Sequence, residues 1–511
     1  MIDLHTPAQV RDWDAAAFAR GVDPAALMEQ AAGHLARALV AEAGGAYGRR
    51  IALLCGKGNN GGDGIAAALR LADRGAAPTV VLVAGERLSG LPAEQLARWR
   101  ARGGRVTTDL RAGLVGAEIV ADCLLGTGAS GAPRGHLAEA VRACGDSGLP
   151  VVACDLPSGV DASTGAVPGA AVRAVRTVTL GAHKRGLWLW PARGHCGVIE
   201  LGELPLLGAG NRPPPVAAVL EARDVADLLP PPAPEGHKRN RGVVVVLAGS
   251  PGMSGAATLV ARGAMAAGAG LVTVATSPAA RPLVAPTVPE ALTADVPDDD
   301  PDAAFEALAS RLEGADALAV GPGLGLQPAT VTLVRRVVRE VDLPLVLDAD
   351  GLNCFRHAGD DLAAHASPLL VLTPHAAELA RLLANEVGEL WPRRVAVVPE
   401  RARAWSAVVV AKGPGTLIAA PDGRQWVNAT GSAALSTGGT GDVLTGMTAA
   451  LVAADPRPEV VSAAVWLHGR AGQLAASGRA MRAVTALDVA AAVPRAYAEL
   501  DALPGRRGAR P

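Results

Sequence analysis

Two glycine-rich stretches carry side chains that could do chemistry. The first, Cys55 to Gly64, reads CGKGNNGGDG and follows an apolar run. Its glycines let the backbone approach a ligand, and free N–H groups at a helix start attract an anion such as phosphate. Asn59, Asn60 and Asp63 add polar groups where a dinucleotide-binding dehydrogenase usually has small residues. The stretch therefore predicts a phosphate-containing ligand with an ion or chemistry beside it. A solvent-exposed Asn/Asp turn is the alternative.

The second stretch, residues 428–446, reads NATGSAALSTGGTGDVLTG. A helix that begins at the second half of this run would aim backbone N–H groups at a transferring phosphoryl group. Asp442 would lie where it can accept a hydroxyl proton. A structural helix cap is the alternative for so short a match.

Three more polar residues follow apolar runs in the first half of the chain. They are Asp122 in ADCLLGTG, and Asp155 and Ser158 in CDLPSG. Ligands of open α/β sheets bind outside the carboxyl ends of the strands, so these residues should share one side of the sheet. Asn60, Asp122 and Ser158 offer hard oxygen donors, which leaves Asp155 available for proton transfer. Each could instead cap a helix or a turn.

The elements that would position these residues alternate regularly. Helical patterns at 7–20 and 24–42 open the chain. Continuous apolar runs then alternate with Ala-, Leu- and Arg-rich segments of helical period, which predicts a parallel sheet covered by helices on both faces. The runs are Ile51 to Leu54, Val80 to Val83, Ile119 to Leu125, Val151 to Cys154 and Thr177 to Leu180.

A proline-rich segment, Glu203 to Arg241, interrupts this alternation. A second strand and helix series follows it, from GVVVVLAGS to a helix expected at GTGDVLTGM, and it also predicts a parallel α/β sheet. A chain of 511 residues is long enough for at least two domains. We predict domains at 1–207 and 221–511, with a linker at 208–220.

Composition and charge limit the classes of partner that the protein is expected to bind. The chain has 48 basic and 49 acidic residues and a formal charge of −1, so no long-range field would attract nucleic acid or an anionic membrane. Six scattered cysteines without a C-x-x-C pair indicate a reduced, cytoplasmic protein. No signal peptide is visible, and the uncharged run 243–261 contains Gly-Ser-Pro-Gly, which favours a strand, turn and helix over a membrane span.

Lysine is rare in this chain. Of the 48 basic residues, only Lys57, Lys184, Lys238 and Lys412 are lysine. An ammonium offers a compact charge and rotatable donors that a guanidinium does not, so these positions are candidates for specific roles. Chance is the alternative for any one of them.

The first half resembles the N-terminal domain of the bifunctional NAD(P)H-hydrate repair enzymes through NNGGDG, DCLLGTG and DLPSG. In that family this Rossmann-like domain is an epimerase that interconverts the R and S forms of hydrated NADH or NADPH at C6 of the nicotinamide ring. The resemblance implies that Asp155 acts at the reacting ring and that Asn60, Asp122 and Ser158 bind potassium. It makes Lys184 a second catalytic group or phosphate contact, with a surface lysine as the alternative. The implied hydrate-binding residues are Asn59, Asn60, Gly61, Gly62, Asp63, Gly126, Thr127, Gly128, Ala129, Ser130, Gly131, Ala132 and Asp155.

The second half resembles the C-terminal, ribokinase-like dehydratase domain of the same family. The motifs that carry this resemblance are GSPGMSGAATL, GPGLG, DADGLN and KGPGT. That domain dehydrates the S form at the expense of ADP in bacteria or ATP in eukaryotes, and phosphoryl transfer implies Mg²⁺ on the nucleotide. Implied hydrate-binding residues are Ala256, Gly323, His375 and Asp442, with Asp442 as catalytic base. Implied nucleotide-binding residues are Lys412, Gly413, Pro414, Gly415, Thr416, Gly438, Gly439, Thr440 and Gly441.

Two segments depart from the family pattern. T-P-H-A-A-E replaces the usual T-P-H-P-G-E, and residues 432–435 replace the usual N-P-G-M. The resemblance nevertheless predicts a homo-oligomeric enzyme that epimerises and dehydrates NADHX or NADPHX and releases AMP and phosphate from ADP. Two alternatives stay open: a ribokinase-like kinase for a small metabolite fused to a dinucleotide-binding domain, and a non-catalytic dinucleotide sensor.

Overall fold

The computed structural model describes residues 1–207 and 213–505. The chain divides into two compact units, the N-terminal unit Asp3–Ala217 and the C-terminal unit, which comprises Met1–Ile2 and Ala218–Pro511. Of the linker predicted at 208–220, residues 208–212 lie outside the described residues.

The N-terminal unit is built on a parallel sheet, as its continuous apolar runs predict. In the described part of the chain the strand order is β4-β3-β2-β5-β6-β7-β9. Each strand expected from the sequence is present. The bounds are β2 Arg50–Cys55, β3 Ala77–Leu82, β4 Arg105–Thr107, β5 Ile119–Cys123, β6 Val151–Cys154, β7 Arg176–Leu180 and β9 Val198–Gly202.

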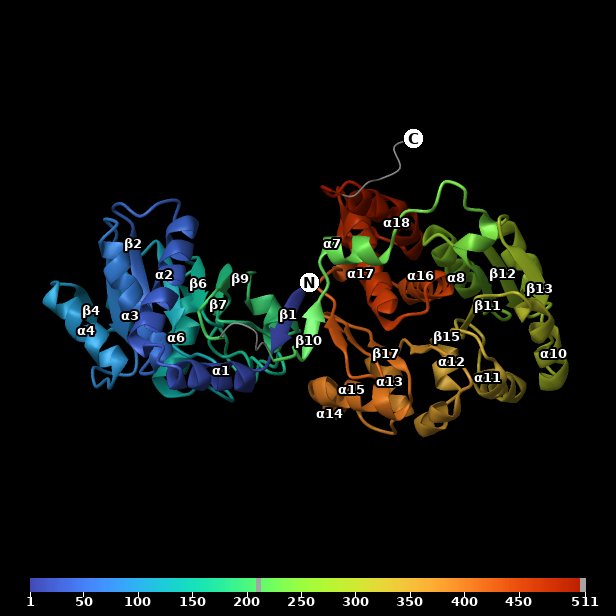
Figure 1. The fold of residues 1–511 in the computed structure, drawn as a ribbon, viewed down its shortest axis with the longest axis horizontal. Helices are drawn as coiled ribbons and strands as arrows, with labels where there is room; N and C mark the ends of the chain where they lie inside the picture. The colour runs from blue at the N-terminus through green and yellow to red at the C-terminus, as the bar shows by residue number, and fades with distance from the viewer. Residues whose placement is uncertain (208–212, 506–511) are drawn as a thin grey trace. The chain divides into compact units, whose positions relative to one another are not determined.

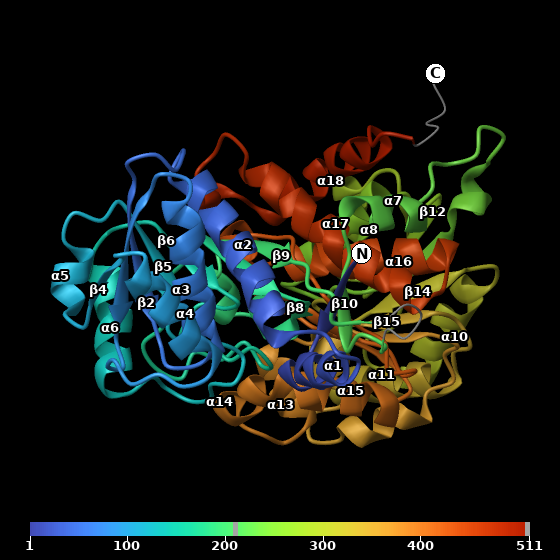
Figure 2. The same ribbon diagram turned by 60° about the vertical axis from the view of Figure 1, so that its left-hand side comes forward.

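Helices cover both faces of this sheet (Figure 1, Figure 2). Alanine-rich α2 and α3 pack with α4 on one face, where small side chains allow close helix packing. The other face is covered by α5 and α6. The bounds are α2 Pro24–Glu42, α3 Asn59–Ala72, α4 Leu91–Ala101, α5 Leu110–Leu114 and α6 Gly135–Asp146. Helix α1 (Pro7–Ala19) begins with a capping box made by Thr6 and Gln9.

A short strand pair at the start of the chain was not expected from the sequence. Strand β1 (Ile2–His5) pairs in parallel with β8 (His183–Lys184), so that His5 lies opposite Lys184. This pairing fixes the backbone of Lys184 by contact with residues almost the whole domain away in sequence.

The C-terminal sheet has the order β13-β12-β11-β14-β15-β16-β17-β18-β19-β10. It is parallel from β13 to β17, but β18 runs antiparallel to both neighbours, so the prediction of a wholly parallel sheet was wrong here. The connections 412–416 and 420–424 are too short for the crossover that a parallel pair needs. The bounds are β10 Ala217–Val219, β11 Val243–Leu247, β12 Leu271–Thr276, β13 Leu292–Asp295, β14 Ala317–Val320, β15 Leu345–Leu347, β16 Leu370–Leu372, β17 Val408–Ala411, β18 Leu417–Ala419 and β19 Gln425–Val427.

One face of this sheet carries α7, α8, α16, α17 and α18, and the other carries α11, α12, α13 and α15 (Figure 1). Helices α8 and α16 approach so closely that a Cβ on Gly446 would collide with the Val260 carbonyl oxygen, and one on Gly263 with that of Val443. The bounds are α7 Ala222–Leu228, α8 Ser254–Ala266, α11 Pro328–Glu340, α12 Asp350–Asn353, α13 Ala376–Leu382, α15 Arg394–Ala404, α16 Thr440–Ala454, α17 Pro458–Ala476 and α18 Ala486–Asp501.

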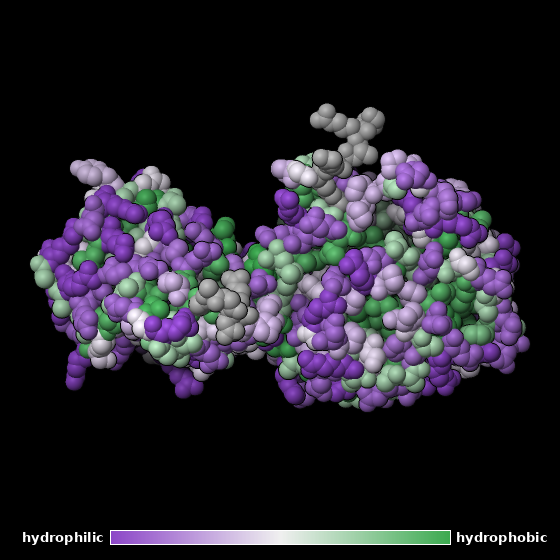
Figure 3. Space-filling model, viewed as in Figure 1, coloured by the Kyte–Doolittle hydropathy of each residue, from purple (hydrophilic) through white to green (hydrophobic). Residues whose placement is uncertain are grey.

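Polar residues cover most of the visible surface of each unit (Figure 3). Among the helices of residues 1–207 and 213–505, none has the length and apolarity needed to cross a membrane. The run 243–261, which has a membrane-like length, divides into β11, a turn and the start of α8 as its Gly-Ser-Pro-Gly interior predicts.

Candidate active sites

A cavity of about 630 Å³ lies at the carboxyl end of the N-terminal sheet. Its polar side is formed by residues that follow β2, β5 and β6, which is where the sequence placed a ligand. Its other side is apolar and comes from α1 and α2, including Val10, Phe18 and Met28. A pocket of this size, with few polar groups among apolar ones, is typical of a small-molecule site.

Asp155 and Lys184 form a buried ion pair in this cavity. Lys184 Nζ lies 2.5 Å from Asp155 Oδ1 and also donates to Thr179 Oγ1 (3.1 Å) and to the Leu180 carbonyl oxygen (2.6 Å). Lys184 is 1% exposed, so the alternative of a surface lysine is wrong. The Asp155 carboxylate also accepts from the backbone N–H groups of Leu180 and Thr127. Three donors, one of them charged, therefore hold this carboxylate in place.

The backbone of Asp155 is unusual, with φ at +66°. A non-glycine residue in this region is strained, and such strain is concentrated at functional sites. Here it turns the chain directly after β6, so that the side chain enters the cavity.

Two further carboxyls line the cavity. Burial raises the pKa of Asp14 on α1, and the charge of Asp155 adds to this while Lys184 opposes it. Burial, followed by the charges of Asp155 and Asp14, raises the pKa of Asp63 well above its usual value. Of these two residues, Asp63 was predicted from its position in NNGGDG.

Asn60, Asp122 and Ser158 are connected by hydrogen bonds: Ser158 binds Asp122 directly, and the backbone of Leu125 joins Ser158 to Asn60. Ser158 donates from its hydroxyl to Asp122 Oδ1 and from its backbone N–H to Asp122 Oδ2, each at 2.7 Å. Burial raises the pKa of Asp122 to about 6, although these hydrogen bonds lower it. Asn60 Nδ2 donates to the Leu125 carbonyl oxygen at 2.9 Å, while the buried Asn60 Oδ1 has no partner among the described residues.

Not every residue implied for hydrate binding reaches the cavity. Asn59, Asn60, Asp63 and residues 126–129 line it, whereas residues 130–132 do not. Gly61 and Gly62 serve packing, because a Cβ would collide with the Gly56 carbonyl oxygen or with the Met28 side chain.

In the C-terminal unit the glycine-rich run forms the start of α16, as expected. Gly439, at φ +87°, precedes the helix, and Asp442 lies in the first turn. Burial raises the pKa of Asp442 to about 7; the charge of Asp348 adds to this and Lys412 opposes it. A carboxylate in this range can take a proton at neutral pH and release it again.

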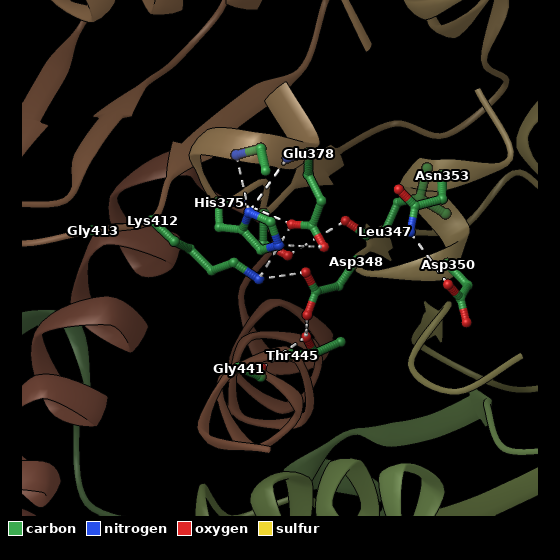
Figure 4. A network of polar contacts seen from close by, with 12 residues as sticks. Leu347, Asp348, Asp350, Asn353, His375, Glu378, Lys412, Gly413, Gly441 and Thr445 are labelled. Carbon is green, nitrogen blue, oxygen red and sulfur yellow. Dashed lines mark hydrogen bonds and ion pairs between the residues drawn. The ribbon is translucent and has the colours of Figure 1, made fainter. Parts of the chain in front are cut away.

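Lys412 joins the two nucleotide-binding segments (Figure 4). Its Nζ lies 2.6 Å from Asp348 Oδ1 and 4.0 Å from Glu378 Oε2. Asp348 Oδ2 accepts from Thr445 Oγ1 at 2.6 Å, which ties the pair to α16. Despite its burial the pKa of Lys412 is raised, because Asp348 and Glu378 favour the charged ammonium.

His375 and Glu378 form the start of α13 despite the departure from the family pattern after His375. The His375 backbone N–H donates to Glu378 Oε2 at 2.8 Å, and His375 Nδ1 accepts from the N–H groups of Ala377 and Glu378. Burial raises the pKa of Glu378, with Lys412 opposing and Asp348 adding to the shift. His375 pairs in parallel with Lys412 through a backbone bridge, so it lies beside the ion pair.

Ala256 and Gly323 also lie together. Gly323, at φ +66°, sits against α8, so that a Cβ there would come within 2.9 Å of the Ala256 Cβ. In the other segment, Thr416 Oγ1 donates to the Gly413 carbonyl oxygen and closes the 412–416 turn. A Cβ on Gly441 would lie 3.4 Å from Lys412 Nζ, so the two predicted nucleotide-binding runs meet at this point.

Two residues that hold groups of this site in place were not predicted from the sequence. Asp348 directly follows β15, in a D-A-D-G-L-N run that was recognised as a motif but given no role. His468 on α17 donates from Nε2 to the Thr440 carbonyl oxygen at 2.9 Å, and burial lowers its pKa to about 4, so it is neutral. A histidine inside an apolar helix gave no signal of this contact.

Both halves of the chain are similar to known protein families. Residues 244–495 match the family model described as NAD(P)H-hydrate dehydratase, and residues 24–186 match the YjeF-related protein N-terminus. The bifunctional NAD(P)H-hydrate repair enzyme Nnr of Moorella thermoacetica is 37% identical over 89% of this chain and 88% of that protein. The enzyme of the same name from Salinibacter ruber is 38% identical over 88% of this chain and 87% of its own length.

The chain belongs to the bifunctional NAD(P)H-hydrate repair enzymes. As a repair enzyme it has an N-terminal epimerase part and a C-terminal dehydratase part. A ribokinase-like superfamily protein from Enterococcus faecalis has a TM-score of 0.50 and 24% identity to this repair enzyme, covering 57% of it and 98% of the solved chain. The ribokinase-like fold predicted for the second half is therefore confirmed.

A solved ADP/ATP-dependent NAD(P)H-hydrate dehydratase from Bacillus subtilis, co-crystallised with ATP/Mg²⁺, is also similar to this repair enzyme. It is 31% identical, with a TM-score of 0.49, over 56% of this chain and 99% of the solved one.

Proposed function

We propose that the N-terminal cavity interconverts the R and S forms of hydrated NADH and NADPH, and that the start of α16 is the dehydratase site. At the second site the S form would be dehydrated to NAD(P)H with ADP, releasing AMP and phosphate. The observation that carries this proposal is Asp442, a carboxylate with a pKa raised to about 7 at a glycine-rich helix start beside the Lys412 ammonium. This arrangement suits proton removal from a hydroxyl that attacks a phosphoryl group.

Dehydration requires a better leaving group than hydroxide. Asp442 takes the proton of the C6 hydroxyl, and the hydroxyl oxygen attacks the terminal phosphorus of the nucleotide. The backbone N–H groups of 438–441 and the Lys412 ammonium stabilise the negative charge that develops on the phosphoryl oxygens. The C6–O bond then breaks, phosphate leaves with the electron pair, the nitrogen lone pair of the ring assists, and loss of a C5 proton restores the double bond.

Magnesium on the nucleotide fits the chemistry of this site. Mg²⁺ is usually bound by phosphate oxygens, waters and one or two carboxylates. Asp348, Glu378 and Asp442 supply carboxyl oxygens around Lys412, and burial followed by the charge of Asp348 raises the pKa of Asp442 and Glu378. Bound there, the ion would neutralise phosphate charge.

In the cavity, Asp155 is placed to act on the C6 centre of the hydrate. Lys184 holds it in one orientation, because its ammonium is itself fixed by the Leu180 carbonyl oxygen. Residues 59–63 and 126–129 would bind the dinucleotide, with the N–H groups at the start of α3 directed at its phosphates.

Potassium fits the group formed by Asn60, Asp122 and Ser158. The test is the buried Asn60 Oδ1, which has no hydrogen-bond partner among the described residues. A cation beside Asn60 would be coordinated by this oxygen. Its positive charge would oppose the rise that burial causes in the pKa of Asp122. Neutral amide and hydroxyl oxygens with one carboxylate are a donor set for a monovalent ion.

Several finer points stay predictions: the boundaries 1–207, 208–220 and 221–511, a homo-oligomer, a cytoplasmic location, and the absence of nucleic-acid or membrane partners. The preference between NADHX and NADPHX is open. So is the chemical route of epimerisation.

The proposal is tested by incubating the protein with hydrated NADH and ADP. Recovery of dihydronicotinamide absorbance, with equal amounts of AMP and phosphate, is the expected result. A stable phosphorylated product without NADH would instead indicate a kinase. Binding without any turnover would indicate a sensor.

A further inference from the structure

The N-terminal cavity contains a carboxyl that the roles above leave without chemistry. Asp63 lies in the first turn of α3, lines the cavity and is 8% exposed. Its carboxyl accepts no hydrogen bond and forms no ion pair with any residue in 1–207 or 213–505. Burying a polar group without a partner is unfavourable, so its retention needs an explanation.

The charges around Asp63 decide its protonation. Lys184, the one ammonium buried among the cavity-lining residues that the structure describes, is committed to Asp155. Burial and the nearby charges of Asp155 and Asp14 raise the pKa of Asp63, which favours its protonated form. The other titratable groups that face the cavity or lie behind Asp63 are Arg11, Lys57, Cys55 and Cys154.

Among the described residues, the cavity therefore contains one carboxylate that is paired with an ammonium and one buried carboxyl that has no ammonium partner and lies near two other carboxyls. Two carboxyls whose environments differ in this way commonly divide the roles of base and acid. Resting on the assignment of this cavity as the epimerase site, we propose that Asp63 is the general acid of epimerisation and works with Asp155 as the base.

Both routes to epimerisation need such a pair. In ring opening, Asp155 takes the C6 hydroxyl proton, the O–H electrons form C6=O, and the C6–N1 bond breaks. The electron pair of the broken C6–N1 bond goes to N1, and N1 takes the proton of Asp63. Rotation about C5–C6 and reversal of these steps close the ring on the other face. In water loss, the C6–O pair leaves with oxygen, the Asp63 proton completes water, and Asp155 deprotonates the water that adds back.

The test is Asp63→Asn in the full chain, which keeps the size of the side chain and removes the acid. We expect the epimerisation rate to fall about 100-fold or more while KM for the hydrate changes little. Dehydration of the pure S form by the same preparation measures how much intact enzyme is present. Asp14→Asn is the matched control: it removes a neighbouring carboxyl of the same cavity, and we expect a much smaller loss.

The pH profile gives a reading that a packing role would not change. The acid must be protonated, so epimerisation by the parent should decline as pH rises through the raised pKa of Asp63. The asparagine variant should lose this decline, whereas Asp14→Asn should keep it. If the asparagine variant is unstable, Asp63→Ala with added formic acid replaces it, and the rate should rise with formic acid concentration.

The outcomes distinguish the acid role of Asp63 from the assignment of the cavity as the epimerase site. A near-parental rate for Asp63→Asn, with the decline at high pH retained, overturns the acid role of Asp63. So does a folded Asp63→Ala that formic acid does not activate. If Asp155→Asn, measured in parallel, also epimerises at the parental rate, the cavity itself has been misassigned.

Discussion

The two sites use the same groups in different pairings. In each, a buried lysine contacts an aspartate: Lys184 with Asp155 at 2.5 Å in one, and Lys412 with Asp348 at 2.6 Å in the other. In the N-terminal cavity the paired aspartate is the one that would act on the substrate. At the start of α16 the proposed base, Asp442, is left outside the pair, and its pKa rises to about 7. The proposed sites thus differ in whether the carboxylate that would act is held by an ammonium.

The largest effect should come from removing each carboxylate. With a mixture of R and S hydrates and ADP, Asp442→Asn should regenerate NADH about 1000-fold more slowly, because the proton acceptor is lost, yet it should still carry a pure epimer towards the mixture. Asp155→Asn should consume the S form and then stall, limited by the slow spontaneous supply of S from R. Near-normal dehydration by Asp442→Asn, or parental consumption of R by Asp155→Asn, would contradict the comparison.

The pH dependence should distinguish the two sites next. Asp442 acts as a base only when ionised, so dehydration should fall as pH drops below about 7, by roughly 100-fold at two units below, since each unit removes about nine-tenths of the ionised form. Rates of S-form dehydration across pH measure this. Epimerisation by the same preparation is the comparison, because Asp155 is paired with Lys184 whereas Asp442 is not. A decline at the same pH in both activities would show that the pairing makes no difference.

Potassium should affect one site. Replacing potassium with tetramethylammonium, which is too large for the group at Asn60 and Asp122, should slow epimerisation on the order of tenfold, the lower end of the cost of disturbing a metal site. Asp122→Ala should abolish the dependence together with most of the activity. Dehydration by the same protein in the same buffers is the control. An epimerase indifferent to the cation would leave these residues as turn and cap groups.

The smallest effect is expected from cutting the chain. Because each site is built within one compact unit, fragments divided between Ala217 and Ala218 should each fold and keep their own activity. This cut keeps most of β10 with its partner β19, which a fragment beginning at residue 221 would lose. Circular dichroism and the two separate assays check it. Activity found only in the full-length chain would contradict independence.

The sequence predicted what local pattern determines. Apolar runs predicted β2, β3, β5, β6 and β7, and the glycine-rich runs indicated that helices begin there, as α3 and α16 do. The rarity of lysine drew attention to Lys184 and Lys412, both of which are buried in ion pairs.

What the sequence could not give depends on contacts between distant segments. The pairing of β1 with β8 brings residues 4–5 to 183–184, and no local pattern announces it. The contact of Thr445 with Asp348 spans 97 residues, and that of His468 with Thr440 joins two helices. Such contacts also set burial, so the pKa of Asp442 could not be derived from its neighbours in sequence.

The glycine contacts between α8 and α16 have a mechanical consequence. Backbones that touch without intervening side chains cannot slide past each other without a collision, so Ala256 on α8 and Asp442 on α16 belong to one rigid body. Any opening and closing during turnover therefore leaves the spacing between Ala256 and Asp442 unchanged.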